Sequence, residues 1–291
     1  MSRVFPKVPL LRFHRSEVLA LIRSSLAEDR YSGDVTSHAL LHPALEVQGV
    51  IISKAPGIIS GLEVVKLMFK NLIRGVKFHA LCEDGEIVRN GKTVATLRGN
   101  ARGMLSAERS MLNILQRMSG IATQTSLFVK KLRGTSAQIL DTRKTAPGLR
   151  ILDKIAVQDG GGRNHRMNLA EMYLIKENHI AAAGGIDRAV ERARRRNGNR
   201  LPIEIEVRTV DEFRQALRQK VDVIMLDNMG TGAMRTAVRE CRGRKLLEAS
   251  GNISLKRVRS VAQTGVDFIS VGSLTNSAKA LDLSFLVVSS V

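Results

Sequence analysis

The sequence contains no tryptophan, only 3% aromatic residues and only two cysteines in a chain of 291 residues. The core must therefore be built mainly from aliphatic side chains. Cys82 and Cys241 lie far apart and belong to no CxxC pair, which argues against a disulfide framework or a cysteine-based zinc site. We expect both side chains to be thiols in a reducing compartment and the protein to be cytoplasmic.

Long hydrophobic runs are also missing. No apolar segment approaches the length needed to span a bilayer, so we expect no membrane association. The first fifteen residues are basic but include no continuous apolar stretch, which argues against a secretory signal. Because 44% of the residues are hydrophobic, the chain can still bury a large core, and its length fits one large α/β domain with or without a smaller companion.

Acidic residues are scarce, since 27 Asp and Glu stand against 46 Lys and Arg, and the formal net charge is +19. Such a balance makes nucleic acid the first partner to consider. The densest basic run, residues 188–200, is however typical of one exposed helix face. The chain has no zinc-finger spacing, no aromatic RNA-binding motif and no heptads after a basic region. We interpret the charge as solvated helix faces and do not expect a nucleic-acid partner.

Up to about residue 110 the sequence mixes helical and strand patterns. Residues 86–97 alternate around Asn90-Gly91, a pair that favours the primed turn of a β-hairpin. We therefore expect a small antiparallel sheet with helices in this part of the chain. The other segments predicted here are helices at residues 16–27 and 62–72 and a strand at residues 47–53.

A long helical pattern over residues 107–131, interrupted at Ser119-Gly120, leads into a second part in which short apolar runs alternate with helical segments. Continuous apolar runs are typical of strands covered on both faces. The predicted strands are residues 137–140, 172–175, 203–207, 223–226, 246–249 and 268–271, and the predicted helices are residues 186–195, 210–219, 233–242 and 255–264. This alternation with short links indicates a parallel sheet, either open or closed as a barrel.

Polar residues decide between these two architectures, because they follow almost every predicted strand. The residues concerned are Asp141 with Arg143 and Lys144, then Lys176, Glu206, Asp227, Glu248 with Ser250, and Gly272 with Ser273. In a β/α barrel all carboxyl ends of the strands open onto one face, which holds the active site. An open sheet would use only the few strands next to one switch point. The pattern favours the barrel.

Fixed cations gather at three of these positions. Arg143 and Lys144 follow the first strand, Arg163 and Arg166 lie in the next loop, and Lys176 follows the second strand. Arginine offers a planar fork of donors that matches a carboxylate or phosphate, and lysine adds a point charge. Such groups would repel one another unless an anion lies between them. The sequence therefore predicts a small ligand with several negative charges.

The same segments resemble one known family. The motifs are DTRKTAPGLR, GGGRNHRMNL, LIKENHI, IEIEV, IMLDNM, EASGNIS, TGVDFISVGSLT and ERSMLNILQRMSGIAT, together with GDVTS near Asp34 and KALDLS near the end. In this order they resemble nicotinate-nucleotide pyrophosphorylase (carboxylating), also called quinolinate phosphoribosyltransferase, over nearly the whole chain. The resemblance implies de novo NAD synthesis, in which quinolinate and phosphoribosyl pyrophosphate give nicotinate mononucleotide, pyrophosphate and CO2.

The resemblance also implies a fold and an assembly. It implies an N-terminal α/β sandwich domain at residues 1–112, joined by the tail at residues 276–291, and an incomplete β/α barrel of about seven strands at residues 113–275. It further implies a homodimer, with higher oligomers open, in which each site borrows residues from the other subunit. In the family's pattern Arg109 is the borrowed arginine, although an ion pair within its own helix would also explain it.

Site residues follow by position in the matching motifs. Thr142, Arg143, His165 and Arg166 match binders of the two quinolinate carboxylates, and Lys144 and Lys176 match contacts to both substrates. Glu206 and Asp227 match carboxylates that face the ribose hydroxyls and the Mg2+ that accompanies pyrophosphate. Strand alternation puts Glu204 on the same side as Glu206, so periodicity alone does not separate the two.

The last two strand ends are assigned to the 5′-phosphate. Glycines there let backbone N–H groups approach a phosphate, and barrels commonly place a phosphate site at this point. The residues assigned are Ser250, Gly251, Asn252, Gly272 and Ser273. Asn252 and Asn276 stand where many relatives have Gly and His, and the role of Asn276 stays open.

Two alternatives remain at this point. One is a protein of the same fold that acts on another acceptor, and the other is a basic RNA-binding protein on a former enzyme scaffold. Quinolinate turnover separates the first from our interpretation. RNA affinity that falls with salt and survives loss of Arg143 would support the second.

Overall fold

The computed structural model describes residues 4–5, 11 and 14–290 of the chain, which form two compact units. The first unit contains residues 4–5, Leu127–Lys144 and Gly162–Ser273. The second contains residues 11 and 14–126, Thr145–Gly161 and residues 274–290. The boundary expected at residue 112 falls inside one continuous helix, α6 (Glu108–Lys131).

The first unit is built on a six-stranded parallel sheet in the order β6-β11-β10-β9-β8-β7. Its strands are β6 (Gln138–Leu140), β7 (Tyr173–Ile175), β8 (Ile203–Val207), β9 (Val223–Asp227), β10 (Leu246–Ser250) and β11 (Phe268–Ser270). A single parallel bridge from Leu140 to Arg163 extends the sheet beyond β6. The predicted incomplete α/β barrel is confirmed, with six strands and this bridge where about seven strands were expected.

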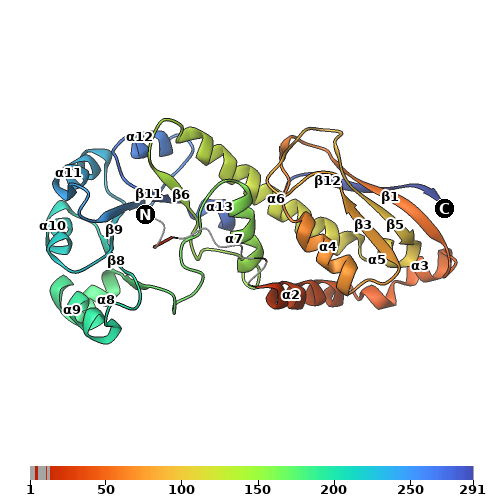
Figure 1. Ribbon diagram of the computed structural model, residues 1–291, viewed down its shortest axis with the longest axis horizontal. Helices are drawn as coiled ribbons and strands as arrows, with labels where there is room; N and C mark the ends of the chain where they lie inside the picture. The colour runs from red at the N-terminus through yellow and green to blue at the C-terminus, as the bar shows by residue number, and fades with distance from the viewer. Residues whose placement is uncertain (1–3, 6–10, 12–13, 291) are drawn as a thin grey trace. The chain divides into compact units, whose positions relative to one another are not determined.

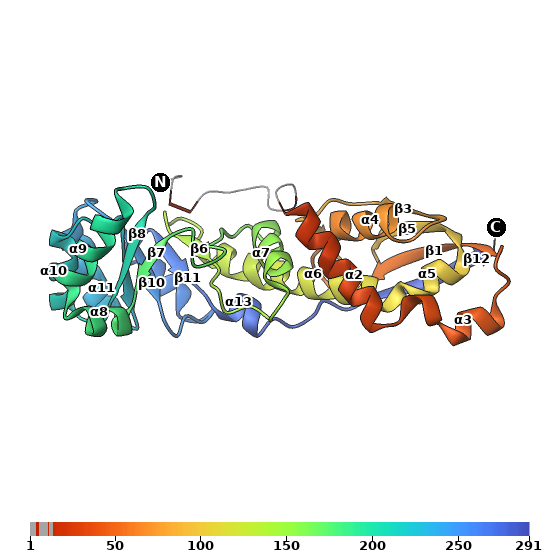
Figure 2. The same ribbon diagram turned by 90° about the horizontal axis from the view of Figure 1, so that it is seen from below.

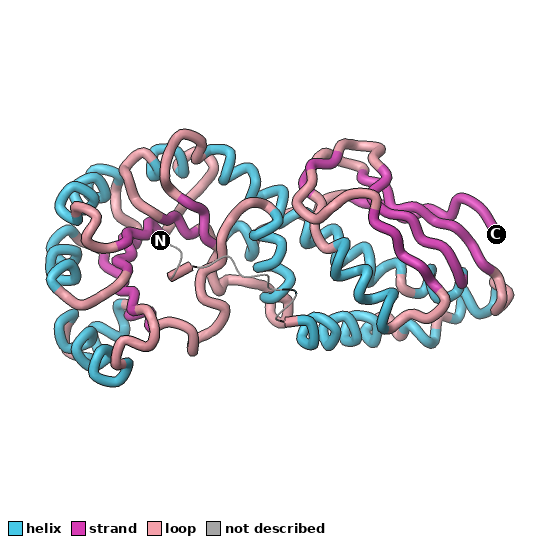
Figure 3. Tube along the Cα trace, in the orientation of Figure 1, coloured by secondary structure: helices cyan, strands magenta, loops and turns pink. Residues whose placement is uncertain are grey.

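Helices cover the outer side of this curved sheet, as the ring of strands and surrounding helices in Figure 3 shows. They are α8 (Glu177–Ala183), α9 (Ile186–Asn197), α10 (Val210–Arg218), α11 (Thr231–Cys241) and α12 (Val258–Ala262). The strands are buried on both faces, and the helices bury only one stripe each, such as Phe213 and Ala216 on α10. This division is why the strands appear as apolar runs and the helices as periodic patterns.

The inner side of the sheet contains an unexpected N-terminal residue. Phe5 is 1% exposed and packs with Leu140, Met172, Val223 and Phe268. Its ring lies 4.9 Å from the ring of Phe268 in an edge-on arrangement. Residues 4–5 therefore help to fill the barrel, a role that the basic N-terminal sequence did not indicate.

The second unit is built on an antiparallel sheet in the order β12-β1-β5-β3, with β1 (Glu46–Ser53), β3 (Val76–Ala80), β5 (Thr93–Asn100) and β12 (Leu283–Ser290). The C-terminal strand β12 pairs with β1, so the tail completes this sheet. Helix α4 (Leu62–Asn71) packs on β3, and α2 (Arg15–Glu28) lies beside α4 in both views (Figures 1 and 2). The other short elements are η1 (Tyr31–Gly33), α3 (Val35–Leu40), β2 (Gly57–Ile58), β4 (Ile87–Val88), α5 (Ala101–Ser106), α7 (Arg150–Asp159) and α13 (Ser273–Asn276).

The predicted hairpin at Asn90-Gly91 is wrong. Strand β4 pairs with β2, whereas β5 joins the larger sheet, so the two strands that flank the turn are not partners. Only Gly91 has a positive φ, 82°, and the N–H of Lys92 donates to the carbonyl of Arg89. This is the pattern of a type II turn, which changes the chain's direction without forming a ladder.

The expected interruption at Ser119-Gly120 is also wrong, because α6 is helical throughout. Glycine is required at position 120 because another part of the backbone passes close to the helix there. A Cβ at this position would lie 2.1 Å from the carbonyl oxygen of Lys279, so the tail's backbone runs directly against the helix. Within the described residues, no helix combines the length and apolarity needed to cross a membrane.

Candidate functional site

A polar cavity of about 570 Å³ opens in the first unit, where the parallel strands end. Its lining comes from the ends of β6 to β11 and the loops that follow them. The lining residues are Thr142, Arg143, Lys144, His165, Arg166, Leu174, Lys176, Glu206, Met225, Asp227, Asn228, Glu248, Ser250, Gly251, Asn252 and Ser270. The structure thus brings together most of the residues that the sequence singled out.

Three predicted residues are not part of this lining. Arg109 lies exposed on α6 in the second unit. Gly272 and Ser273 follow β11, and Ser273 begins the short helix α13. The sequence in turn missed four lining residues, namely Leu174, Met225, Asn228 and Ser270, and it singled out Glu248 only as a polar strand-end residue without assigning it to the site. Glu248 and Ser270 lie within strands β10 and β11, where a single sequence does not tell an inward polar residue from a structural one.

Two arginines face this cavity with unused donors. The Nε atoms of Arg143 and Arg166 are both buried and have no hydrogen-bond partner among the described residues. Burial lowers the pKa of Arg166, and the charge of Arg143 lowers it further. One Nη of Arg166 donates to the carbonyl oxygen of Met172 at 2.8 Å, which fixes the guanidinium. Two like charges with free donors at one cavity wall form a site for an anion.

Lys176 and Glu206 form an ion pair at the cavity wall, with Nζ and Oε2 2.9 Å apart. The lysine side chain is 49% exposed and that of Glu206 only 10%. Lys176 precedes α8, and its backbone N–H donates to Nδ1 of His179 at 3.0 Å. His179 therefore fixes the loop that carries the lysine rather than entering the cavity.

Asp227, at the end of β9, has two neighbours. The Nδ2 group of Asn228 donates to its Oδ2 at 3.0 Å, and Nε of Arg208 lies 3.6 Å from the same oxygen. Glu206 is paired in register with Met225 on β9, so the two carboxylates sit at the ends of neighbouring strands. They offer oxygen ligands from two adjacent positions in one wall of the cavity.

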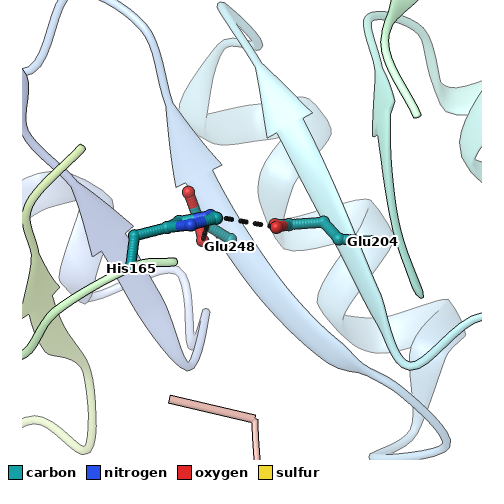
Figure 4. Close-up of side chains that lie close together, drawn as sticks. All are labelled: His165, Glu204 and Glu248. Atoms are coloured by element: carbon teal, nitrogen blue, oxygen red, sulfur yellow. Dashed lines mark hydrogen bonds and ion pairs between the residues drawn. The ribbon is translucent and has the colours of Figure 1, made fainter. Parts of the chain in front are cut away.

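The structure separates Glu204 from Glu206. Glu204 is fully buried and Oε2 lies 3.0 Å from Nε2 of His165, whereas Glu206 borders the cavity. Oε2 of Glu248 lies 3.7 Å from the same nitrogen (Figure 4). The three side chains form one buried cluster at the base of the cavity.

Hydrogen bonding fixes the tautomer of His165. The backbone N–H of Arg166 donates to Nδ1 at 2.8 Å, so Nδ1 carries no proton and Nε2 donates its own to Glu204. Burial raises the pKa of Glu204. Burial also raises the pKa of Glu248, and the nearby charge of Glu204 adds to that effect.

This cluster has the spacing of a metal site, because one ligand atom from each residue lies within 4.8 Å of the others. A metal would need the lone pair of Nε2, which is protonated as long as Nδ1 accepts the backbone N–H. The raised carboxyl pKa values instead favour a retained proton between the two glutamates. We therefore assign no metal here, and the ring of His165 acts as a fixed neutral wall of the cavity.

The comparisons with known proteins agree with this geometry. The family model for the C-terminal domain of quinolinate phosphoribosyl transferase matches residues 121–286, and that for the N-terminal domain matches residues 34–119. The chain is 42% identical to a nicotinate-nucleotide pyrophosphorylase [carboxylating] of Mycobacterium leprae, over 90% of this chain and 94% of the relative. It is 40% identical to a chloroplastic protein of the same name from Arabidopsis thaliana, over 93% and 83% of the two chains.

A solved structure gives the same result in three dimensions. The nicotinate-nucleotide pyrophosphorylase from Francisella tularensis aligns with a TM-score of 0.90 and 40% identity. The alignment covers 97% of this chain and 98% of that one. The likeness therefore extends over both units and is not confined to the barrel.

Proposed function

This chain belongs to the quinolinate phosphoribosyl transferase family, and we propose that its polar cavity carries out the reaction of that family through the residues described above. The protein is an enzyme that transfers phosphoribosyl from phosphoribosyl pyrophosphate to quinolinate. The transfer is coupled to decarboxylation, and the products are nicotinate mononucleotide, pyrophosphate and CO2. The observation that carries the assignment to the cavity is the pair of buried Nε donors on Arg143 and Arg166, for which the described part of the chain offers no hydrogen-bond partner.

Quinolinate bears two adjacent carboxylates on a pyridine ring, and two fixed guanidinium groups match that charge pattern. Arg143 and Arg166 would hold the carboxylates and so aim the ring nitrogen at the ribose. His165 does not need to donate to the substrate, since both its ring nitrogens are already engaged. Its flat ring would instead fix the position of the pyridine and, through the N–H of Arg166, that of the arginine.

Phosphoribosyl pyrophosphate would occupy the opposite wall. Lys144 and Lys176 supply positive charge for the departing pyrophosphate, and Lys176 is held in place by Glu206. As the bond at the anomeric carbon breaks, the ribose gains oxocarbenium character, which the carboxylates of Glu206 and Asp227 stabilise. The pyridine nitrogen then attacks, and the resulting cationic ring accepts the electrons left when the adjacent carboxylate departs as CO2. The ring carbon that loses the carboxylate then takes up one proton.

Glu206 and Asp227 are also the residues that would hold Mg2+. Both are carboxylates at the cavity wall on neighbouring strands, and oxygen ligands with room for water and substrate oxygens are what this ion prefers. When bound, the ion neutralises charge on the pyrophosphate. The two carboxylates would orient the waters around the ion and the ribose hydroxyls.

A homodimer with a shared site would explain Arg109. Its side chain is exposed on α6 and belongs to the unit that does not contain the cavity. We expect it to reach the cavity of a second copy, where it would add a further cation to the quinolinate site. Arg109→Ala and Arg143→Ala proteins should each be inactive, and mixing their refolded subunits should restore activity, because one site in each mixed dimer is intact. Mixtures that stay inactive would contradict a shared site.

The decisive assay measures nicotinate mononucleotide formed from quinolinate and phosphoribosyl pyrophosphate with magnesium. Arg143→Ala, Lys144→Ala and Lys176→Ala should each lower kcat/KM by about a hundredfold or more, since each removes a charge-assisted contact to substrate. Arg218→Ala, which removes a cation from α10 instead, is the matched control and should retain full activity. If the folded wild-type protein shows no turnover, the assignment is wrong.

A further inference from the structure

Two neighbouring loops at the cavity rim share an unusual backbone. Asn228 follows β9 with φ of 54°, and Gly251 and Asn252 follow β10 with φ of 91° and 50°. Left-handed backbone is uncommon for residues other than glycine and costs free energy, so the surroundings must hold it. Two such asparagines, with Gly251 next to one of them, indicate that surrounding contacts hold this rim in a fixed conformation.

The loops hold each other directly. The N–H of Asn228 donates to the carbonyl of Ser250 at 2.9 Å, and Nδ2 of Asn252 donates to Oδ1 of Asn228 at 3.2 Å. The contact is close enough that a Cβ on Gly251 would lie 2.2 Å from that same Oδ1. Since Asn228 also donates to Asp227, the chain of contacts links a cavity carboxylate to the loop at residues 250–252.

One arginine outside the cavity lining completes this network. Nη2 of Arg257 donates to the carbonyl of Met229 at 2.8 Å. Nη1 lies 3.2 Å from the carbonyl oxygen of Gly251 and 3.4 Å from that of Asn252. A single guanidinium therefore binds carbonyls from both loops, and its planar fork is suited to this task.

The hydrogen bonds from Arg257 connect the two loops and also orient the peptide groups that follow Gly251 and Asn252. In a planar trans peptide the C=O and the following N–H point in opposite directions. Because the carbonyls of Gly251 and Asn252 turn toward Arg257, the N–H groups of Asn252 and Ile253 turn away from it. In the part of the chain that the structure describes, neither N–H finds a hydrogen-bond acceptor. Successive free N–H groups at a turn form a concavity that binds anions.

We propose that Arg257 is a positioning residue for substrate phosphate: it holds the loop at residues 250–252 so that its N–H groups face a phosphate group in the cavity. The inference rests on the proposed function, since phosphoribosyl pyrophosphate supplies that phosphate. Arg257 does not line the cavity and acts only through the loop. Its positive charge behind the carbonyls also favours an anion on the far side of the same peptides.

The test compares two arginines of the same segment. Arg257→Lys keeps the charge but loses the fork, and Arg259→Lys is the matched control, because Arg259 binds the carbonyls of Lys131 and Arg133 instead. For Arg257→Lys we expect the KM for phosphoribosyl pyrophosphate to rise about tenfold, the order expected for loss of charged hydrogen bonds. The KM for quinolinate should stay within about twofold of wild type, as should both constants of the control.

Calorimetry with ribose 5-phosphate supplies a readout that does not depend on turnover. Arg257→Lys should bind this probe about tenfold more weakly than wild type. If wild type makes no nicotinate mononucleotide but binds the probe about tenfold more tightly than Arg257→Lys, the proposed function fails while the loop inference stands. Equal affinities for wild type and variant would overturn the inference, as would an equal rise of KM for both substrates. Should Arg257→Lys not fold, Arg257→Gln is measured in the same way with the same expectation.

Discussion

Asp159, at the end of α7, offers a sharp test of buried electrostatics in the second unit. Its Oδ2 accepts a hydrogen bond from the hydroxyl of Ser60 at 2.5 Å. Burial raises the pKa of this carboxyl from 3.8 to about 7, the hydroxyl of Ser60 opposes the shift, and the charge of Asp84 adds to it. The folded protein therefore holds a proton on Asp159 at pH values where the unfolded chain has lost it.

The sign and size follow from linkage. A carboxyl whose pKa is raised on folding contributes stability that is fully present below pH 3.8 and is lost as the pH rises to about 7. A shift of roughly 3 units at ~1.4 kcal/mol per unit gives on the order of 4 kcal/mol as an upper bound. The carboxyl is only partly buried, so we expect roughly half of that, about 2 kcal/mol.

Asp159→Asn should remove this dependence, because the amide stays neutral and its oxygen can still accept from Ser60. We would measure the free energy of unfolding in urea at pH 5 and pH 8 for both proteins. Because about a third of the loss already occurs between pH 3.8 and pH 5, the difference between variant and wild type should shift in favour of the variant by about 1 kcal/mol between the two pH values. Comparing differences cancels the titration of Glu204 and Glu248, which both proteins share. A constant difference between the two proteins across this pH range would refute the reasoning.

Three further predictions concern packing and the rim. Gly120→Ala should lower the free energy of unfolding in urea by about 1–3 kcal/mol, since the added Cβ would meet the carbonyl of Lys279. Gly232→Ala is the control: this glycine lies in α11 with open space around it, so alanine should raise the free energy of unfolding by roughly 0.5–1 kcal/mol. Arg117→Ala should lower the free energy of unfolding by about 3 kcal/mol, because it leaves the fully buried carboxylate of Asp153 without its ion-pair partner at 2.8 Å. Arg117→Lys should recover part of this stability. A loss below about 1 kcal/mol for Arg117→Ala would show that the pair is dispensable. Gly251→Ala should lower kcat/KM for phosphoribosyl pyrophosphate by about tenfold or more with little change in melting temperature, and unchanged kinetics would show that the rim tolerates movement.

Local pattern was enough to locate the parallel strands. Each predicted strand from residue 137 onward overlaps β6 to β11 to within about a residue or two, because strands covered on both faces appear as unbroken apolar runs. Turn chemistry was less informative. Asn90-Gly91 favours a hairpin in isolation, but partner choice for β4 and β5 depends on segments far away in sequence, and β2 paired with β4 instead.

For the candidate site, too, the sequence predicted some features and missed others. The positions of cations and carboxylates after successive strands predicted a polar cavity, because the carboxyl ends of parallel strands share one edge. Strand alternation could not assign depth, so only the matching motif favoured Glu206 over Glu204, and the contact with His165 then placed Glu204 in the buried cluster. Nor could it find Arg257, whose three carbonyl partners lie in two different loops.

By itself the amino-acid sequence determined the parallel α/β architecture, the set of charged residues at the strand ends and, through its ordered motifs, the family. These properties depend on residue type and spacing, which a linear chain already contains. Only the tertiary structure decided which sheet each short strand joins, that Phe5 fills the barrel, and which proton His165 donates. Those outcomes depend on contacts between residues far apart in the chain, and the free energy of such contacts exists only when the chain is folded.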